Sequence, residues 1–490
     1  MAAGKELSGA VEWRETKLDG TSAKIVPESG LLERVCKSLQ GRVSKISRFL
    51  EKAWSIGVSD PKKVIHCVKV GLALSLVSLF YYMRPLYEGV GGNAMWAVMT
   101  VVVVFEYTVG ATLCKCINRA TGTLLAGSLG IGVHWVATQS GERFEPIIIG
   151  LSVFLLASAT TFSRFIPSIK ARFDYGALIF ILTFSLVSVS GFRVDHKLFD
   201  MAHQRLSTVL IGTSICLLIS MFFCPVWAGI ELHLLIHRNM EKLADSLDGC
   251  LAEFFKENNG NDNTVDEQSN KKMQGYKCTL NSKTAEESMA NFARWEPSHG
   301  AFNFGHPWKQ YLKIGAAMRG CACCIESLSS CIDPEVQVPG SVKNNFREVC
   351  IRVSSHSSKV LKELVVTMKT MTKSSTTDLT VGEMNFAVQE LQNALKSLPI
   401  QLLFPTISAN NATAETTTEQ FAVPLIKILP LATAMSLLIE IAARIEGIVD
   451  QVDELADLAE FKPAADNKSK QGQSAIENID DETMKILQKV

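Results

Sequence analysis

The hydrophobic positions of this chain are concentrated in its first half, where they form six long apolar runs. The runs cover residues 64–83, 93–107, 111–138, 146–165, 174–192 and 205–229. A helix that crosses a bilayer needs ~20 mostly apolar residues, a length that four of the runs reach easily. The second run is short, and its consecutive valines would also suit a buried strand. Because an isolated strand leaves its backbone groups unpaired in lipid, we interpret all six runs as membrane-spanning helices.

Amphipathic segments lie on both sides of these runs. Leu31–Trp54 has apolar residues at helical spacing with basic residues between them, which is typical of a helix on an anionic membrane surface or of one packed on a soluble domain. Further amphipathic helices are expected at 230–255, 310–332, 343–373, 380–397 and 422–460. Lys427, Glu440 and Arg444 interrupt the apolar run Phe421–Ile448, so we interpret that run as a buried soluble helix rather than a seventh span.

These patterns predict an all-α membrane protein with six transmembrane helices followed by a cytosolic helical domain. The expected divisions are a cytosolic N-terminal segment at 1–63, a six-helix transmembrane domain at 64–229 and a cytosolic helical domain at 230–490. Disordered linkers are expected near 256–285 and 405–420, where polar residues dominate. Both termini are expected in the cytosol because basic residues gather at the loops on that side, at Lys62, Lys63, Arg164, Lys170 and Arg172.

Composition narrows the possible functions. The 490 residues carry 49 basic and 49 acidic side chains, and this balance argues against a nucleic-acid partner, which would need a basic surplus. The sequence lacks the phosphate-binding pattern GxxxxGK[ST] and the hydrolase patterns HExxH and GxSxG, so we expect neither an enzyme nor a cofactor. Cys321, Cys323, Cys324 and Cys331 match no standard zinc spacing, and we interpret them as reduced cytosolic thiols rather than metal ligands.

Two cations stand out inside the third apolar run. Lys115 and Arg119 are four residues apart and share one helix face, which continues through Thr123 and Gly127. Arg119 lies ~12 Å along the helix from Ala111, which is too deep for easy snorkelling. Placing Arg119 in lipid would cost ~2.5 to 3.5 kcal/mol on insertion scales, so we expect it to face protein or water. A small, polar and positive stripe of this kind suits a water-filled path for anions.

A third cation, Arg205, heads a comparable stripe in the sixth run. Guanidinium groups match carboxylates in bidentate geometry, so Arg119 and Arg205 could form successive positive rings for a passing carboxylate, with Lys115 adding to the field. The alternative is structural, because buried ions are usually paired. Glu106, at the end of the second run, could neutralise Lys115 or Arg119.

Acidic residues gather on the loops that the topology places outside the cell. Glu88, Asp195 and Asp200 could hold a hard cation by oxygen ligation, with His196 beside them. Solvated loop charges are the alternative interpretation.

Several short motifs resemble one known family. The longest is the segment NAMWAVMTVVVVFE at 93–106. The others are GATL at 110–113, NR at 118–119, FDYG at 173–176, ILTF at 181–184, RLSTV at 205–209, CPVWAG at 224–229 and WEP at 295–297. Together they resemble the plant aluminium-activated malate transporter family, densely over most of 58–256 and more loosely in the C-terminal half.

The resemblance implies a voltage-dependent anion channel that passes malate, and in some members sulfate, nitrate or chloride, across a plant membrane. It also implies a homodimer in which each chain has six spans and the pore lies between the subunits. The family's pore arginines match Arg119 and Arg205. The acidic outer residues linked to the aluminium response match Glu88 and Asp200, with the third at Asp195 or His196. We expect the plasma membrane rather than the vacuolar membrane.

Two other function classes stay open at this point. A coupled dicarboxylate carrier would need a counter-ion site and alternating access. A membrane-anchored scaffold without transport would be indifferent to Arg119→Ala. The expected partners are malate and inorganic anions, the lipid bilayer and a second copy of the chain.

Overall fold

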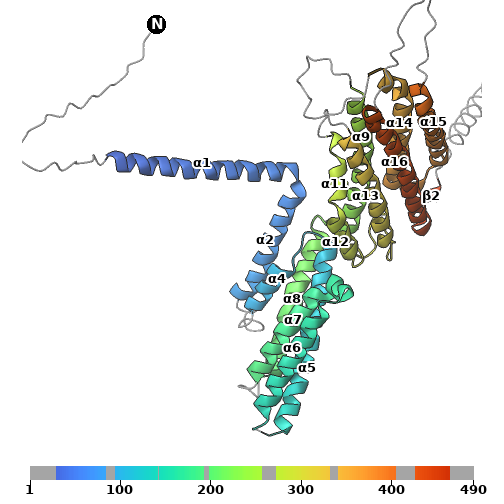
Figure 1. Cartoon of the computed structure of the whole chain (residues 1–490). Coiled ribbons are helices and arrows are strands. Elements are labelled where there is room, and N and C mark those ends of the chain that lie inside the picture. Colours follow the sequence, from blue (N-terminus) through green and yellow to red (C-terminus); the bar gives the residue numbers. More distant parts are fainter. Residues whose placement is uncertain are drawn as a thin grey trace, which may run out of the picture. The chain divides into compact units, whose positions relative to one another are not determined.

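The computed structural model describes residues 29–83, 94–141, 143–191, 198–256, 272–331, 340–403 and 425–463, and nearly all of them are helical (Figure 1). Within these ranges the only sheet joins strands β1 (Thr372–Lys373) and β2 (Lys462–Pro463). The two strands are parallel, with Thr372 opposite Lys462. The all-α prediction is therefore confirmed.

Helix α1 (Ser29–Ser59) belongs to a unit that ends at Ile65, and it is described by itself. It begins and ends close to the predicted amphipathic segment. Its apolar row is exposed at Leu39, Val43, Ile46, Phe49, Leu50 and Trp54. The row lies on one face because its members recur at helical spacing, and Lys45, Arg48 and Lys52 occupy the opposite face.

The apolar first half of the chain forms a group of six helices. They are α2 (Pro61–Tyr82), α4 (Ala94–Val104), α5 (Val109–Gln139), α6 (Glu145–Ser163), α7 (Pro167–Gly191) and α8 (Leu198–Phe222). Helices α5 to α8 run side by side (Figure 1). By length and composition, α5, α6, α7, most of α8 and part of a later helix could each cross a membrane, and α4 is a shorter apolar helix. These helices fit a membrane protein, and the number of six spans stays a prediction.

Helices α4, α7 and α8 differ most from their predicted bounds. Helix α7 begins at Pro167 rather than 174, and α8 begins at Leu198 rather than 205. Helix α4 has 11 residues instead of the run 93–107, about 16 Å of helix against a hydrocarbon core of about 30 Å. It is nevertheless a helix, so the strand alternative for its valines is wrong. Helix α8 ends at Phe222 rather than 229, because Cys224 has a φ of 44° and Pro225 follows it.

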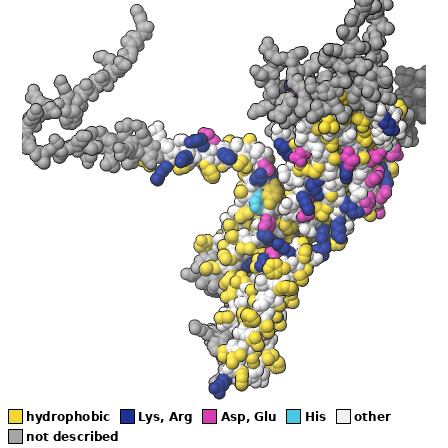
Figure 2. Space-filling view, in the orientation of Figure 1, with side chains coloured by type: hydrophobic (Ala, Val, Ile, Leu, Met, Phe, Trp, Pro, Cys, Tyr) yellow, Lys and Arg dark blue, Asp and Glu magenta, His cyan; other side chains and the backbone are white. Residues whose placement is uncertain are grey.

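Close packing joins α5 to α7. A Cβ atom on Gly122 would lie 2.8 Å from the carbonyl oxygen of Gly176, and one on Gly130 would lie 2.8 Å from Val187 Cγ1. The outer surface of α5 to α8 is apolar (Figure 2). Its exposed side chains include Leu124, Leu125, Leu151, Phe154, Leu155, Leu182, Leu210 and Leu218. A surface of this kind suits lipid or another apolar partner rather than water.

The second half of the chain is a bundle around one hydrophobic core. Its helices are α9 (Ala228–Phe254), α11 (Tyr276–Leu280), α12 (Lys283–Ala293), α13 (Trp308–Ser330), α14 (Gly340–Thr370), α15 (Thr377–Leu403) and α16 (Leu425–Leu458). The core contains Leu232, Met240, Tyr311, Met318, Leu361, Leu438 and Ile445, all fully or almost fully buried. The predicted division of the chain at residue 229 falls at the start of α9.

Helix α16 is apolar and long enough to cross a membrane, yet it packs against α13, α14 and α15. Leu431, Leu438 and Ile441 are buried in the shared core. On its outer face Arg444 donates a hydrogen bond of 2.7 Å to the exposed carboxylate of Glu440. This packing supports the interpretation of 421–448 as a buried helix of the bundle.

One expected linker is partly ordered. The prediction placed a disordered segment near 256–285, but α11 and the start of α12 fall within it. Tyr276 and Thr279 are buried against the bundle, which explains why this polar stretch is helical. The other expected linker, near 405–420, lies outside the described residues.

Candidate functional site

Two arginines from different helices line one small cavity between α4, α5, α7 and α8. The cavity has a volume of about 20 Å³, which is enough for a single water molecule. Arg119 of α5 and Arg205 of α8 both reach it. The other polar and aromatic residues of its wall are Trp96, Thr123, Thr183 and Thr208. None of the residues that line the cavity is acidic. The two side chains that sequence reasoning placed in successive rings therefore share one site within the chain.

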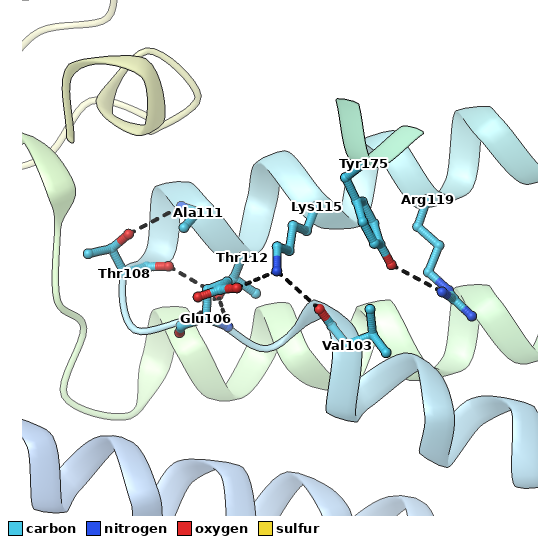
Figure 3. A network of polar contacts seen from close by, with 8 residues as sticks. All are labelled: Val103, Glu106, Thr108, Ala111, Thr112, Lys115, Arg119 and Tyr175. Carbon is cyan, nitrogen blue, oxygen red and sulfur yellow. Dashed lines mark hydrogen bonds and ion pairs between the residues drawn. The ribbon is translucent and has the colours of Figure 1, made fainter. Parts of the chain in front are cut away.

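Arg119 is almost fully buried, with 8% of its surface exposed. Its Nη1 donates a hydrogen bond of 3.1 Å to the hydroxyl oxygen of Tyr175 on α7 (Figure 3). Its Nε is buried and has no hydrogen-bond partner among the described residues. A buried guanidinium normally uses its donors, so Arg119 retains an unmet capacity to bind an oxygen atom.

Arg205 lies well inside α8 and is half-buried. Its guanidinium carbon lies 4.1 Å from the ring centroid of Trp96 on α4, a stacked cation–π contact. This contact orients the guanidinium without neutralising its charge. Within the part of the chain that the structure describes, neither Arg205 nor Arg119 forms an ion pair with a carboxylate.

Lys115 differs from the two arginines because it has an acidic partner. Its ammonium forms an ion pair with Glu106, in the short link between α4 and α5 (Figure 3). The ammonium also lies 3.4 Å from the carbonyl oxygen of Val103 and 5.5 Å from the ring centroid of Tyr175. Of the alternatives left open for Glu106, the structure pairs it with Lys115, so this charge is largely cancelled.

Tyr175 connects the cations of α5. Its ring faces the Lys115 ammonium, while its hydroxyl group accepts a hydrogen bond from Arg119 (Figure 3). Gly176 follows it and lets α7 approach α5 closely, which brings the Tyr175 side chain within reach of both residues. Arg119 and Arg205 together form a positive site in an apolar helix group. Such a site attracts an anion, and carboxylate oxygens match its guanidinium donors.

A buried carboxylate holds the first turn of α5. Glu296 is 4% exposed, and its oxygens accept hydrogen bonds from the backbone N–H groups of Gly110 at 3.1 Å, Ala228 at 2.6 Å and Gly229 at 3.0 Å. Gly110 lies in the first turn of α5, and the other two residues begin α9. Burial raises the pKa of Glu296, and these hydrogen bonds oppose the shift. The carboxylate thus anchors the helix that carries Lys115 and Arg119.

Lys69 and Arg164, two further cations of the apolar half, have structural partners. Lys69 is buried and donates a hydrogen bond of 2.7 Å to the carbonyl oxygen of Cys224. Arg164 pairs with Asp174 at 2.7 Å. Arg119 and Arg205 differ from these residues because they line the cavity and have no carboxylate partner among the described residues.

The expected outer cation site falls mostly outside the described residues. Glu88, Asp195 and His196 lie in segments that the structure does not describe, and Asp200 is placed only as a residue near the start of α8. Within the described ranges, no three His, Cys, Asp or Glu side chains are arranged to hold a metal ion. The described cysteines, Cys321 and Cys331 among them, are free thiols.

Three residues of the site escaped sequence reasoning. Trp96 and Tyr175 are aromatic residues in apolar helices, where nothing in the local pattern distinguishes a cation partner from a core residue. Glu296 lies 186 residues beyond Gly110, so no spacing rule could connect the two. Their motifs contributed to the family resemblance without suggesting a role.

Comparison with known proteins gives one consistent result. A family model described as "Aluminium activated malate transporter" matches residues 54–423 and 405–456. The chain is 58% identical to aluminum-activated malate transporter 10 of Arabidopsis thaliana, over 95% of this chain and 98% of that protein. It is 45% identical to aluminum-activated malate transporter 2 of the same species, over 88% of this chain and 83% of that protein. It is 40% identical to aluminum-activated malate transporter 1 of Triticum aestivum, over 92% of this chain and 94% of that protein.

Proposed function

The chain belongs to the aluminium-activated malate transporter family, a family of transporters rather than enzymes, and on this premise we propose that it is a channel for malate and other anions in a plant membrane. It is a multi-pass membrane protein. Sulfate, nitrate and chloride are the further anions proposed, and voltage is proposed to control its opening.

One observation carries this proposal. Arg119 and Arg205 line a common cavity inside an apolar helix group, and no acidic residue lines that cavity. Two guanidinium groups of like charge are energetically costly in such surroundings unless an anion binds between them. A permeant carboxylate supplies that negative charge, and guanidinium donors match its two oxygens. Because Lys115 is paired with Glu106, the two arginines supply most of the positive charge that attracts the anion.

The proposal also covers the topology, the oligomeric state, the location and the outer cation-sensing residues. Six spans with both termini in the cytosol would place the α9 to α16 bundle on the cytosolic side. The cavity within one chain is too small for malate, which supports a path completed by a second copy of the chain. We therefore propose a homodimer, with the plasma membrane as its location and Glu88, Asp195 and Asp200 as the outer cation-sensing residues.

No energy source beyond the membrane voltage is needed for efflux. A dianion that leaves a cytosol ~100 mV negative gains about 4.6 kcal/mol. A passive conductance is therefore sufficient, and a coupled carrier would need an additional counter-ion site.

The test is a voltage clamp on cells that express the chain while the malate gradient is changed. Wild type should give a reversal potential that follows malate, and Arg119→Gln and Arg205→Gln should each lose malate conductance. Arg143→Gln is the matched control, because Arg143 is exposed in the turn between α5 and α6. A wild-type chain at the cell surface that carries no malate, sulfate or nitrate current at any voltage would contradict the proposal.

The same recording separates the alternatives. A coupled carrier gives a malate flux that stops when its counter-ion is removed. A scaffold without transport gives no flux, and its partner binding is unaffected by Arg119→Gln.

A further inference from the structure

A cavity of about 490 Å³ opens on the helical bundle, away from the arginine site. It lies between the C-terminal end of α12, the loop 294–307, the start of α13 and the end of α16. Its volume falls in the range of pockets that hold drug-sized ligands, and it is far larger than a four-carbon dicarboxylate requires. The permeant anion is therefore a poor fit for it.

The charges around this cavity favour an anion. Arg294 and Lys309 line it, and neither side chain has a hydrogen-bonding or ion-pair partner among the described residues. Its two carboxylates are already engaged. Glu296 accepts hydrogen bonds from three backbone N–H groups, and Glu454 accepts one from Lys313 at 2.8 Å. Two cations thus remain for a ligand, and no carboxylate in the wall is left to neutralise them.

A largely enclosed histidine also lies in this wall. The side chain of His299 is 9% exposed, and its Nδ1 lies 2.8 Å from the carbonyl oxygen of Pro297. Because a carbonyl only accepts, Nδ1 carries the hydrogen of that bond. The other ring nitrogen, Nε2, is buried without a hydrogen-bond partner among the described residues and lies 3.8 Å from Oε2 of Glu296.

The remaining wall is aromatic. Phe302 and Trp308 form the inner part, with ring centroids 5.2 Å apart, and Phe304 stands at the rim with 82% of its surface exposed. The loop can place these rings together because Gly300 and Gly305 adopt φ values of 58° and 88°, where other residues are disfavoured. Aromatic faces bind apolar or planar bodies, whereas inorganic anions gain nothing from them.

From these features we infer that the cavity is an effector site for an organic anion that carries a carboxylate or phosphate group on an aromatic or apolar body. Arg294 and Lys309 bind the charged group, and Phe304 and Trp308 contact the body. The loop that frames the cavity also carries Glu296, which holds the first turn of α5. An anion that binds this loop therefore acts on the helix of Arg119, and this effector role rests on the proposed channel function.

The binding test uses the full chain purified in lipid nanodiscs and isothermal titration calorimetry. The probes are phenyl phosphate and benzoate, with benzylamine as the cationic analogue and inorganic phosphate as the anion without a ring. We expect at least one of the two aromatic anions to bind once per chain, and benzylamine and inorganic phosphate to bind at least tenfold more weakly. Comparing phenyl phosphate with benzoate identifies the preferred charged group.

Variants locate the site. Arg294→Gln and Lys309→Gln should each weaken binding of the aromatic anion at least tenfold. Phe304→Ser should weaken it as well, and folding is not at risk because Phe304 is exposed. Lys283→Gln is the matched control, because Lys283 is an exposed cation at the other end of α12. Absence of binding, equal binding of benzylamine, or unchanged affinity in Arg294→Gln and Lys309→Gln would overturn the inference.

Current recordings test the effector role separately. The bound probe should change the malate current of wild type at fixed voltage, and the change should be absent in Lys309→Gln. Binding without any change in an otherwise normal current would overturn the effector role. Binding by a chain that carries no current would instead count against the proposed channel function and leave the binding site intact.

Discussion

The backbone N–H of Gly110 donates a hydrogen bond of 3.1 Å to the carboxylate of Glu296, 186 residues further along the chain. The same carboxylate accepts hydrogen bonds from Ala228 and Gly229. The first turns of α5 and α9 therefore share one acidic group. The partial positive charge at the N-terminal ends of both helices offsets part of the cost of burying this negative charge. One side chain thus joins the helix of the arginine site to the helical bundle.

Replacing this group should destabilise the protein. Glu296→Gln keeps the shape but removes the charge, and it turns one acceptor oxygen into a donor facing backbone N–H groups. We expect the free energy of unfolding to fall by roughly 2 to 4 kcal/mol. The charge-assisted hydrogen bonds become weaker, and the carboxylate charge no longer interacts with the two helix N-termini. Thermal unfolding of the purified chain measures the change. Glu287→Gln, at an exposed position of α12, is the control. Equal stability of the two variants would show that the three hydrogen bonds contribute nothing.

Periodicity was a good guide to the bundle and a weaker one to the apolar half. Helices α9 and α16 begin and end within a few residues of their predictions, because each has an apolar stripe that must be buried. The apolar runs of the first half indicate roughly how long each helix is, but they do not indicate the residue at which it ends. The end of α4 precedes Phe105, and α5 begins after Thr108, whose side chain accepts a hydrogen bond from the Ala111 N–H at 3.3 Å.

The arginine site was predictable only in part. The spacing of Lys115 and Arg119 placed both on one face of a helix, and depth in the membrane marked Arg119 as exceptional. The partners came from other helices. Which side chain of α7 meets Arg119 depends on how α5 and α7 cross, and local sequence does not encode that crossing. The same limit applies to Trp96 and Arg205, which belong to α4 and α8.

Tyr175 should tune the arginine site without being essential to it. Tyr175→Phe removes the hydroxyl group that accepts the hydrogen bond from Arg119 and keeps the ring that faces Lys115. The freed guanidinium should become less well positioned, so malate conductance should fall by up to roughly tenfold, the factor that about 1.4 kcal/mol represents. Whole-cell current measures the effect. The loss should be smaller than in Arg119→Gln, and a larger loss would mean that Tyr175 contacts the anion itself.

The ion pair of Lys115 and Glu106 should set the local field. Glu106→Gln leaves the ammonium uncompensated, so malate conductance should rise by up to roughly threefold, whereas Lys115→Gln should lower it by a similar factor, since half-exposed pairs are worth about 1 kcal/mol at most. The double variant restores neutrality and should resemble wild type. Recording the malate conductance of the double variant tests this, and a double variant that stays at the level of either single variant would contradict it.

Helix α1 should bind a bilayer that contains anionic lipid. Its exposed row from Leu39 to Trp54 and its opposite basic face fit an interfacial helix, and only Asp60 separates it from α2. A peptide of residues 29–59 should become helical with phosphatidylserine vesicles, with Trp54 fluorescence shifted to the blue. Binding should weaken with salt and with phosphatidylcholine alone, because each basic residue contributes about 1 kcal/mol near an anionic surface. Indifference to phosphatidylserine would favour the alternative of a helix packed on protein.

Acid should destabilise the bundle through two buried histidines. The Nδ1 of His233 lies 3.0 Å from the hydroxyl oxygen of Tyr311, and the Nε2 of His306 lies 3.3 Å from the same oxygen. Burial lowers the pKa of His233 to about 4, with a further contribution from His237. Burial also lowers the pKa of His306 to about 4, and His233 adds to that shift.

The sign of the effect follows from proton uptake. Between about pH 6.5 and 4 the unfolded chain binds protons at these two positions that the folded chain does not, so the free energy of unfolding decreases as the pH falls through this range. Each histidine contributes on the order of 3 kcal/mol once the pH is below both pKa values. The melting temperature of the purified chain should therefore fall between pH 7.5 and 5. His306→Gln should flatten that dependence, and His203→Gln, at an exposed position, should not. Because Gln cannot take up the proton, an unchanged slope in His306→Gln would mean that the acid-sensitive group lies elsewhere.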